Sequence, residues 1–359
     1  MSDKVLFCCT PGYSKMTGYY YRVQRDKESL ERLGLSVDIV VCSNFMSTLK
    51  IFLRSFFLRK YSHIFFQNIG ASVPFVPAVL INRITGMNHY YLIYHGSLDD
   101  LASFRFYKFR RFIYKLTEFL LVTSKTKIIC VSDYMKTYLC NMYKNFCDNF
   151  FVIPNIPSEG FIDSCTNLLN VSKHDLREKL HLPQDRFLIC YAGNSQPWQK
   201  ADLLCDLVKS LPNINFVILT LDVCFFKSRL TTACENVQIL TVSNDAVPMY
   251  LRASDALYML RDDNEVNRCS CPTKGVEYLL SATPIIISER IGDLSDEVAE
   301  AESGLVVPDY MLNDQDKLAL LISSWANDAC LAPGKIPDSI KNKYTIKMQD
   351  YAYNKILDL

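Results

Sequence analysis

One stretch of the sequence combines a cation, a carboxylate and a helix start in an arrangement that could bind a phosphorylated ligand. It spans residues 268–280 and follows an apolar run that ends near Leu260. Proline is well tolerated in the first turn of a helix, so this pattern predicts a helix that begins near Pro272. Free N–H groups at a helix start attract anions, and Lys274 would lie beside them. Glu277 would lie one turn later on the same face, where its carboxylate could accept hydrogen bonds from ribose hydroxyls.

The same residues also fit a less specific interpretation. Lysine and glutamate three positions apart are common on helix surfaces, where the pair contributes only a few tenths of a kcal/mol. Spacing alone leaves both interpretations open. Cys269 and Cys271 lie just upstream, but two thiols without a second pair or histidines fall short of a zinc site. We therefore expect no metal ion and no cofactor.

Short apolar runs alternate with segments of helical character along the chain, which predicts parallel strands buried on both faces. A break near Pro154 separates two such series. We predict two doubly wound α/β domains, with residues 1–158 in the first, 159–338 in the second, and a terminal helix over 339–359 that returns to the first. Ligands of such sheets bind beyond the carboxyl ends of the strands, so the cleft between the domains is the expected site. The runs are Val5–Cys9, Val37–Val41, Ile64–Phe66, Tyr90–Tyr94, Ile128–Val131 and Phe151–Ile153, then Phe187–Tyr191, Phe216–Leu219, Val237–Leu240, Ala256–Leu260 and Ile285–Ile287.

The composition is that of a globular protein with no global charge. Of 359 residues, 49% are hydrophobic and 21% charged, and the formal net charge is +1. This balance argues against disorder and against nucleic acid as a partner. Fourteen cysteines lie scattered in a chain far longer than disulfide-dependent scaffolds. The first residues lack a signal-peptide pattern, and no apolar stretch approaches the 18 or so residues that span a bilayer. We expect a cytoplasmic protein.

Residues 268–284 resemble the nucleotide-sugar signature of family-4 glycosyltransferases, in which Pro-Thr-Lys leads into Glu-Tyr-Leu. Further similar segments follow the family's order: 129–132, 152–155, 191–193 with 198–200, 242–261, 292–293 and 304–306. The resemblance implies a GT-B fold, with two Rossmann-like domains facing each other across a cleft. It also implies a metal-independent transfer of a sugar, with retention, from a nucleoside diphosphate sugar to a saccharide or lipid-linked saccharide in surface polysaccharide synthesis. The donor residues implied are Glu277 for the ribose, with Thr273, Lys274, Arg268, Gly193 and Lys200 around the diphosphate.

Residues of the N-terminal half complete the expected site. Gly12 and Gly18 flank the loop after the first apolar run, where small side chains would let a sugar approach the backbone; an ordinary turn is the alternative. His95-Gly96 follows another predicted strand and resembles the family's His-Gly position near the reacting carbon. We expect His95, Lys274 and Arg268 to serve catalysis, and Gly12, Gly18, His95 and Gly96 to lie on the sugar and acceptor side.

The chain departs from the family at three places. The family often carries two glutamates eight positions apart, but Cys269 stands eight residues before Glu277. A glycine–arginine pair is usual after the first strand of the second domain, and Gly193-Asn194 stands there. Thr283 replaces the usual glycine. Two other functions therefore stay open: a non-catalytic relative that binds a nucleotide sugar or a lipid, and a nucleotide-sugar epimerase.

Two N-terminal segments, 50–61 and 104–119, combine aromatic and basic side chains. Cationic helices with exposed aromatic residues lie at the interface of anionic membranes, where each basic residue contributes about 1 kcal/mol. An amphipathic helix that covers the sheet with its apolar face is the alternative. The first interpretation predicts a peripheral protein of the inner face of the cell membrane.

Overall fold

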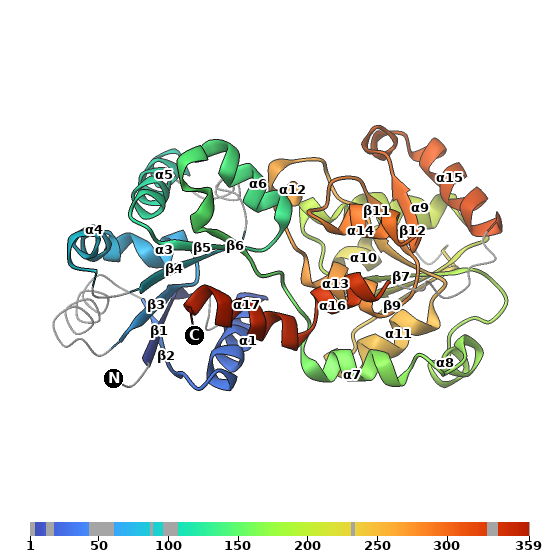
Figure 1. Cartoon of the computed structure of the whole chain (residues 1–359). Coiled ribbons are helices and arrows are strands. Elements are labelled where there is room, and N and C mark those ends of the chain that lie inside the picture. The colour runs from blue at the N-terminus through green and yellow to red at the C-terminus, as the bar shows by residue number, and fades with distance from the viewer. Residues whose placement is uncertain are drawn as a thin grey trace. The chain divides into compact units, whose positions relative to one another are not determined.

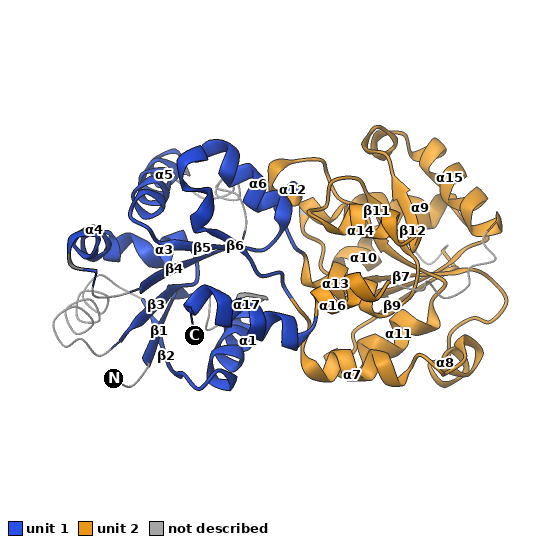
Figure 2. Cartoon of the chain, viewed as in Figure 1, with its two compact units in different colours: residues 1–155, 268–271, 345–359 blue, residues 156–267, 272–344 orange. Residues whose placement is uncertain are grey.

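The chain folds into two compact units, drawn in two colours in Figure 2. The computed structural model describes residues 4–11, 18–42, 61–86, 89–95, 107–230, 234–328 and 337–358. Unit 1 combines residues 1–155, 268–271 and 345–359, and unit 2 combines residues 156–267 and 272–344. Unit 1 is therefore built from three separate stretches of the chain, the middle one only four residues long.

Unit 1 is built on a parallel sheet with the strand order β2-β1-β3-β4-β5-β6 among its described strands (Figure 1). Every pairing is parallel, and the register places Val5 beside both Val37 and His63. The order reverses at β1, so the switch point at which doubly wound sheets bind ligands lies between β1 and β3. The strands are β1 (Lys4–Cys9), β2 (Ser36–Val41), β3 (His63–Phe66), β4 (His89–Tyr94), β5 (Lys127–Cys130) and β6 (Phe150–Val152).

Helices α6 and α3 of unit 1 begin at side-chain caps. Ser132 caps α6 by accepting a hydrogen bond from the backbone N–H of Met135, and Asn68 caps α3 through Ala71 in the same way. The chain can thus leave a strand and enter a helix within a few residues. The helices are α1 (Gly18–Arg32), α3 (Ile69–Ser72), α4 (Val76–Thr85), α5 (Tyr107–Thr123) and α6 (Asp133–Met142), with short 3-10 turns at Val73–Phe75 and Lys144–Asn149.

The last two helices of the chain correct one sequence prediction. A single helix over 339–359 was expected, but α16 (Asp338–Lys343) and α17 (Ile346–Leu357) are separate. The break occurs because Thr345 has extended backbone and its side chain accepts a hydrogen bond from the N–H of Met348, which starts a new helix. The second helix, α17, belongs to unit 1, whereas α16 belongs to unit 2.

Helix α17 supplies part of the core of unit 1. Tyr353, Ile356 and Leu357 are buried in one cluster with side chains of β1, β3 and β4. Its polar face is also bound: Arg32 of α1 pairs with Asp350 at 2.8 Å. The amide of Gln349 donates to Asp26 at 3.1 Å. Burial of three large apolar side chains stabilises unit 1 by several kcal/mol.

Unit 2 contains a second parallel sheet with a different order, β12-β11-β10-β7-β8-β9 (Figure 1). Counted within the unit, this is the 3-2-1-4-5-6 order of dinucleotide-binding folds, and its switch point lies between β7 and β10. The strands are β7 (Leu188–Ala192), β8 (Asn215–Leu219), β9 (Val237–Leu240), β10 (Ala256–Met259), β11 (Ile285–Ser288) and β12 (Gly304–Val307).

Helices cover the sheet of unit 2 and connect its strands. The strands β7, β8, β10 and β11 are buried along their whole length, which explains their continuous apolar sequences. No helix among the described residues is long and apolar enough to cross a membrane. The helices are α7 (Glu159–Asn167), α8 (Lys173–Lys179), α9 (Ala201–Ser210), α10 (Val223–Arg229), α11 (Val247–Ala253), α12 (Glu265–Arg268), α13 (Thr273–Leu280), α14 (Leu294–Glu300) and α15 (Gln315–Asp328).

Candidate functional site

The loop after β7 is held rigid at the switch point of unit 2. The Tyr191 hydroxyl lies 2.5 Å from both the carbonyl oxygen of Asn194 and Oε1 of Gln199. A Cβ atom on Gly193 would lie 2.5 Å from that hydroxyl, so the loop can close in this form only around glycine. Farther along, the N–H and the hydroxyl of Ser195 both donate to Asp222, at 2.7 and 2.8 Å. The loop therefore presents a fixed backbone surface beside β10.

Helix α13 starts as the sequence predicted, and its geometry fits an anion site. Pro272 is the N-cap, and no side chain caps the first turn. Lys274 and Glu277 form an ion pair, with Nζ 2.9 Å from Oε2; the side chain of Lys274 is 40% exposed and that of Glu277 12%. This ion pair is the contact that the less specific interpretation predicts, and a bound diphosphate would compete with Glu277 for Lys274.

A tyrosine joins α13 to the end of β7. The hydroxyl of Tyr278, which is 1% exposed, accepts a hydrogen bond of 2.7 Å from the backbone N–H of Ala192. Gly275 lets α13 pack closely against Leu294 of α14, since a Cβ atom at position 275 would lie 2.4 Å from the Leu294 side chain. The position of Lys274 relative to the β7 loop is thus fixed by packing on both sides of the helix.

Arg261 lies between these elements, and sequence analysis assigned it no role beyond the general resemblance of residues 242–261. It follows β10, and with Lys274, Gln199 and Ala192 it lines a small cavity of about 10 Å³. Burial lowers the pKa of its guanidinium to about 10. The group stays charged at neutral pH, although its surroundings make the charge unfavourable. In the sequence, the signal for this residue was a cation just after a strand that borders the switch point of unit 2.

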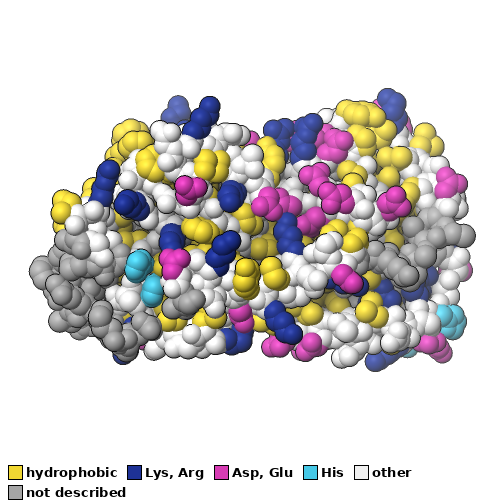
Figure 3. Space-filling view, viewed as in Figure 1, with side chains coloured by type: hydrophobic (Ala, Val, Ile, Leu, Met, Phe, Trp, Pro, Cys, Tyr) yellow, Lys and Arg dark blue, Asp and Glu magenta, His cyan; other side chains and the backbone are white. Residues whose placement is uncertain are grey.

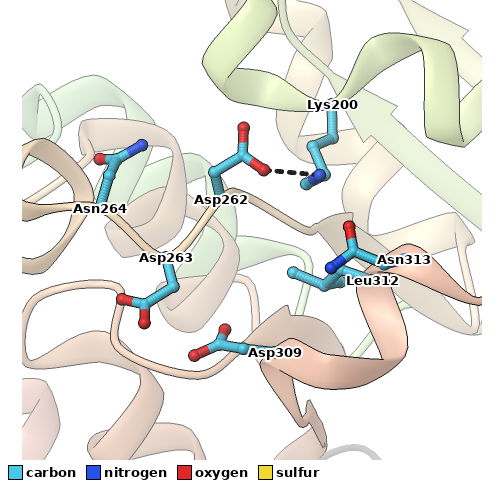
Figure 4. A pocket seen from close by; sticks show the side chains of 7 residues that line it. All are labelled: Lys200, Asp262, Asp263, Asn264, Asp309, Leu312 and Asn313. Atoms are coloured by element: carbon cyan, nitrogen blue, oxygen red, sulfur yellow. Dashed lines mark ion pairs between the residues drawn. The ribbon is translucent and has the colours of Figure 1, made fainter.

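Lys200 belongs to a neighbouring pocket of about 360 Å³, shown in Figure 4. Its Nζ lies 2.6 Å from Asp262, and the same pocket is lined by Asp263 and Asp309. The residue has a left-handed backbone with φ of 46° and forms the N-cap of α9. The structure therefore brings Lys200 to an acidic pocket and not to the cavity that Arg261 and Lys274 share.

The other predicted donor residues lie at different places in the structure. Thr273 is the first residue of α13. Arg268 is half-buried at the end of α12, and by its contacts it belongs to unit 1, whereas Lys274 belongs to unit 2. Cys269, which stands where the family has an acidic residue, is fully buried, and its carbonyl oxygen accepts a hydrogen bond from the Ser132 hydroxyl at 3.1 Å.

The switch point of unit 1 gathers neutral polar groups. Gln67 is fully buried, and its Oε1 accepts a hydrogen bond of 3.2 Å from the backbone N–H of Thr10. The Asn68 amide donates to the Thr10 hydroxyl at 3.3 Å. The Nε2 atom of Gln67 is buried and makes no hydrogen bond with any residue that the structure describes. A buried amide in that state is unusual and is available to a ligand acceptor.

His95 follows β4 at the same edge of the sheet. Burial and, to a smaller extent, the positive charge of Arg22 lower the pKa of its imidazole to about 3. A hydrogen bond with the backbone of Gln67 acts in the opposite direction. The ring is therefore neutral at physiological pH. It can donate or accept one hydrogen bond without adding charge to this edge.

Several predicted positions lie outside the described residues. Gly12 and Gly96 are among them, and so is the basic segment 50–61 except for Tyr61. Gly18 is the first residue of α1. Among the described residues no group of three or more His, Cys, Asp or Glu side chains is arranged to hold a metal ion, and every described cysteine is a free thiol.

No model of a known protein family matches the chain, and no curated protein matches it significantly. Solved structures do match. A glycosyltransferase from Rickettsia africae is 14% identical with a TM-score of 0.72 and 99% coverage of both chains. Anabaena Alr3699/HepE in complex with UDP and glucose is 15% identical with a TM-score of 0.69 and 99% coverage of both chains. WaaG, a glycosyltransferase involved in lipopolysaccharide biosynthesis, is 14% identical with a TM-score of 0.58, over 95% of this chain and 99% of its own.

These likenesses define the fold. The chain has two Rossmann-like units in the GT-B arrangement of sheets and connections, the class of fold to which these glycosyltransferases belong. The fold class inferred from the sequence is thereby confirmed. At 14–15% identity the likeness extends to the fold and not to the reaction.

Proposed function

We propose that the chain is a glycosyltransferase that takes a sugar from a nucleoside diphosphate sugar bound at the switch point of unit 2. The observation that carries the proposal is the convergence of Lys274, Arg261 and the uncapped start of α13 beside the β7 loop. Anions bind where a helix start and cations meet. HepE, which shares the fold, has been crystallised with UDP, so UDP-sugars are the first donors to test.

The proposed roles follow from the chemistry of glycosyl transfer. Negative charge develops on the leaving diphosphate, and fixed donors aimed at that charge lower the barrier more than any other single effect. Lys274 and the N–H groups of α13 supply such donors. Glu277 would accept hydrogen bonds from the ribose once Lys274 turns to the phosphates. Thr273 and Gly193 border the same strand ends, whereas Lys200 lines the neighbouring acidic pocket and would need to leave Asp262 to reach a phosphate. Retention and a metal-independent reaction are part of this proposal.

Donor binding is the first test, with Glu277→Ala as the decisive variant. UDP at a hundred times its dissociation constant should add about 2.7 kcal/mol to the stability of the wild type, a shift that thermal unfolding resolves. The variant should lose most of this shift while its melting temperature without ligand stays close to that of the wild type. The proposed ribose contact is wrong if both proteins gain equally from UDP.

A second measurement separates the alternatives to transfer. Nuclear magnetic resonance of UDP-glucose incubated with the protein and a panel of saccharide acceptors would follow the anomeric signal. A new glycosidic signal supports transfer and also reports retention or inversion. An epimerised sugar without acceptor identifies an epimerase, and bound but unchanged donor across the panel identifies a binding protein.

We further propose that the acceptor side works at an anionic membrane surface, with a lipid-linked saccharide of surface polysaccharide synthesis as the acceptor. Helix α5 leaves four large apolar side chains exposed on one helical face, at 66% for Phe109, 65% for Phe112, 48% for Leu116 and 51% for Phe119. Helix α4, which packs beside α5, adds Ile84 at 89%. Figure 3 shows hydrophobic side chains with Lys and Arg beside them over α4 and α5.

The basic side chains around this apolar face indicate that it binds an anionic surface. Lys108, Arg110 and Lys115 of α5 and Arg83 of α4 are exposed around the apolar side chains. An apolar stripe bordered by cations matches the interface of an anionic bilayer, to which each basic residue contributes about 1 kcal/mol. A protein partner with an acidic groove would use the same charges, so the test has to exclude it.

Vesicle sedimentation tests this surface. Wild type should sediment with vesicles of phosphatidylcholine and phosphatidylglycerol and stay in solution with phosphatidylcholine alone. The triple variant Phe109→Asp, Phe112→Asp, Phe119→Asp should lose at least ten-fold in bound fraction. Leu320→Asp, at a side chain that is 71% exposed on α15 of unit 2, is the matched control and should bind as wild type does. Equal binding of the triple variant, or no binding of wild type, contradicts the membrane proposal.

A further inference from the structure

Arg261 is fixed in place by its own backbone. Its N–H donates to Oγ of Ser288 at 2.9 Å, and its carbonyl oxygen accepts from the same hydroxyl at 3.0 Å. Ser288 is fully buried at the end of β11, so Arg261, the second residue after β10, is tied to the neighbouring strand. The guanidinium therefore extends from a rigid position at the strand ends.

The carboxylates near Arg261 pair with other cations. Asp262, the next residue, pairs with Lys200 at 2.6 Å. Asp263 pairs with Arg290 at 2.6 Å, and Asp309 lies 3.3 Å from the same guanidinium. Lys200 and Arg290 thus each have an acidic partner.

Arg261 makes no ion pair with any described carboxylate. Its side-chain hydrogen bond is a long one, 3.4 Å from Nη1 to the neutral Oδ1 of Asn267. Arg261 is half-buried, and a guanidinium group that gives up hydration is stabilised mainly where an anion repays the loss. The cavity it lines holds about 10 Å³, room for about one atom the size of water and not for a nucleoside. The arrangement therefore calls for a small anionic group such as a phosphate oxygen.

We propose that Arg261, together with Lys274, binds the diphosphate of the donor and takes the part of the arginine that the resembling family carries after the first strand of this unit. Gly193-Asn194 occupies that position here, and no cation stands in it. The phosphates would lie over the start of α13, with the guanidinium on the β10 side and the ammonium of Lys274 on the helix side. This inference rests on the proposed function, since it assigns a residue to the same donor.

Calorimetric titration with UDP and with uridine tests the assignment. Arg261→Met should weaken UDP binding by about 10- to 100-fold, the usual effect of one charged hydrogen-bond partner, and leave uridine binding unchanged. Arg290→Met is the matched control, because this arginine already has two carboxylate partners. It should change UDP affinity by less than two-fold.

The outcomes separate this inference from the proposed function. If Arg261→Met keeps its fold and binds UDP as tightly as wild type, Arg261 does not bind the phosphates, although the donor site stands. Equal losses for UDP and uridine assign it a purely structural role. If wild type binds no nucleotide, the proposed function is wrong, and the inference about Arg261 falls with it. Should methionine destabilise the protein, Arg261→Gln, which can keep a contact with Asn267, gives the same comparison.

Discussion

The two sheets of this protein end in chemically different surroundings at their switch points. In unit 2 the residues at β7 and β10 include Arg261 and the Lys274–Glu277 pair. In unit 1 the residues after β1 and β3 are the neutral Thr10, Gln67 and Asn68, which hydrogen-bond one another. The sheets share parallel pairing and buried strands, so the difference comes from the loops and helices that follow the strands.

This difference indicates what each edge can bind. A charged edge with an arginine that lacks an acidic partner favours an anion, whose charge would repay the desolvation of the guanidinium. An edge of amides and hydroxyls beside a neutral imidazole favours a neutral, hydroxyl-rich molecule, because each group can exchange one hydrogen bond without a change of charge. Under the proposed function, the edge of unit 2 suits the phosphates of the donor, and the edge of unit 1 suits sugar hydroxyls.

The largest expected effect concerns the charged edge. Affinity for UDP should exceed that for uridine by at least about 100-fold, because two cations and a helix start contribute about 1.5–3 kcal/mol for each charged contact. Raising the salt concentration should weaken UDP binding and leave uridine binding nearly constant. Calorimetry with UDP, UMP and uridine measures both trends. Similar affinities for UDP and uridine would remove the contrast between the two edges.

A smaller effect concerns the neutrality of His95. Its pKa is lowered to about 3 in the folded chain, against about 6.5 when unfolded. The unfolded state therefore binds the extra proton, so this stabilising contribution is complete above pH 6.5 and is lost as the pH falls toward 3. The slope from one proton is at most about 1.4 kcal/mol per pH unit. Thermal unfolding of His95→Asn should depend less steeply on pH between 6.5 and 4 than that of wild type.

The control for this measurement is His174→Asn, since the side chain of His174 is 72% exposed. Its pH profile should coincide with that of wild type. If His95→Asn also follows the wild-type curve, the ring is not held neutral by the fold, and the edge of unit 1 carries a positive charge at mildly acidic pH.

The smallest effect concerns Gln67. Gln67→Met destabilises the fold by removing the acceptor for the Thr10 N–H. It also stabilises the fold by removing a buried amide nitrogen that has no partner among the described residues. Because the two effects oppose each other, we expect the free energy of unfolding to change by less than about 1 kcal/mol. Asn68→Ala, which deletes the cap of α3, should cost about 1 kcal/mol by comparison. Affinity for UDP should be unchanged in both variants, whereas a loss of transfer rate confined to Gln67→Met would place the acceptor at this edge.

Much of the fold could be predicted because its strands are buried on both faces. Continuous apolar runs such as Val5–Cys9 and Ile285–Ile287 coincide with β1 and β11 to within one residue. The start of α13 was predictable from Pro272 for a similarly local reason. The break between α16 and α17 was missed because a single cap, Thr345, interrupts an otherwise helical pattern.

The charge balance at the site could not be predicted in this way. Arg261 is followed by Asp262 and Asp263, and in the sequence alone these are its natural partners. Both acids instead pair with cations from other loops, Lys200 and Arg290. Ion pairs depend on side-chain direction across loops far apart in sequence, and composition and spacing carry little of that information. Gln67 was missed for a related reason, since its burial depends on the packing of three strand ends.

Helix α17 has a consequence for the order in which the protein can fold during synthesis. Its residues Tyr353, Ile356 and Leu357 complete the core of unit 1, yet they are translated after the whole of unit 2. Domains usually fold in the order in which they leave the ribosome. Here the first strands to emerge must wait, with part of their apolar surface uncovered, while unit 2 forms its own sheet. Chaperones that bind apolar segments should therefore engage the nascent N-terminal strands longer than those of unit 2.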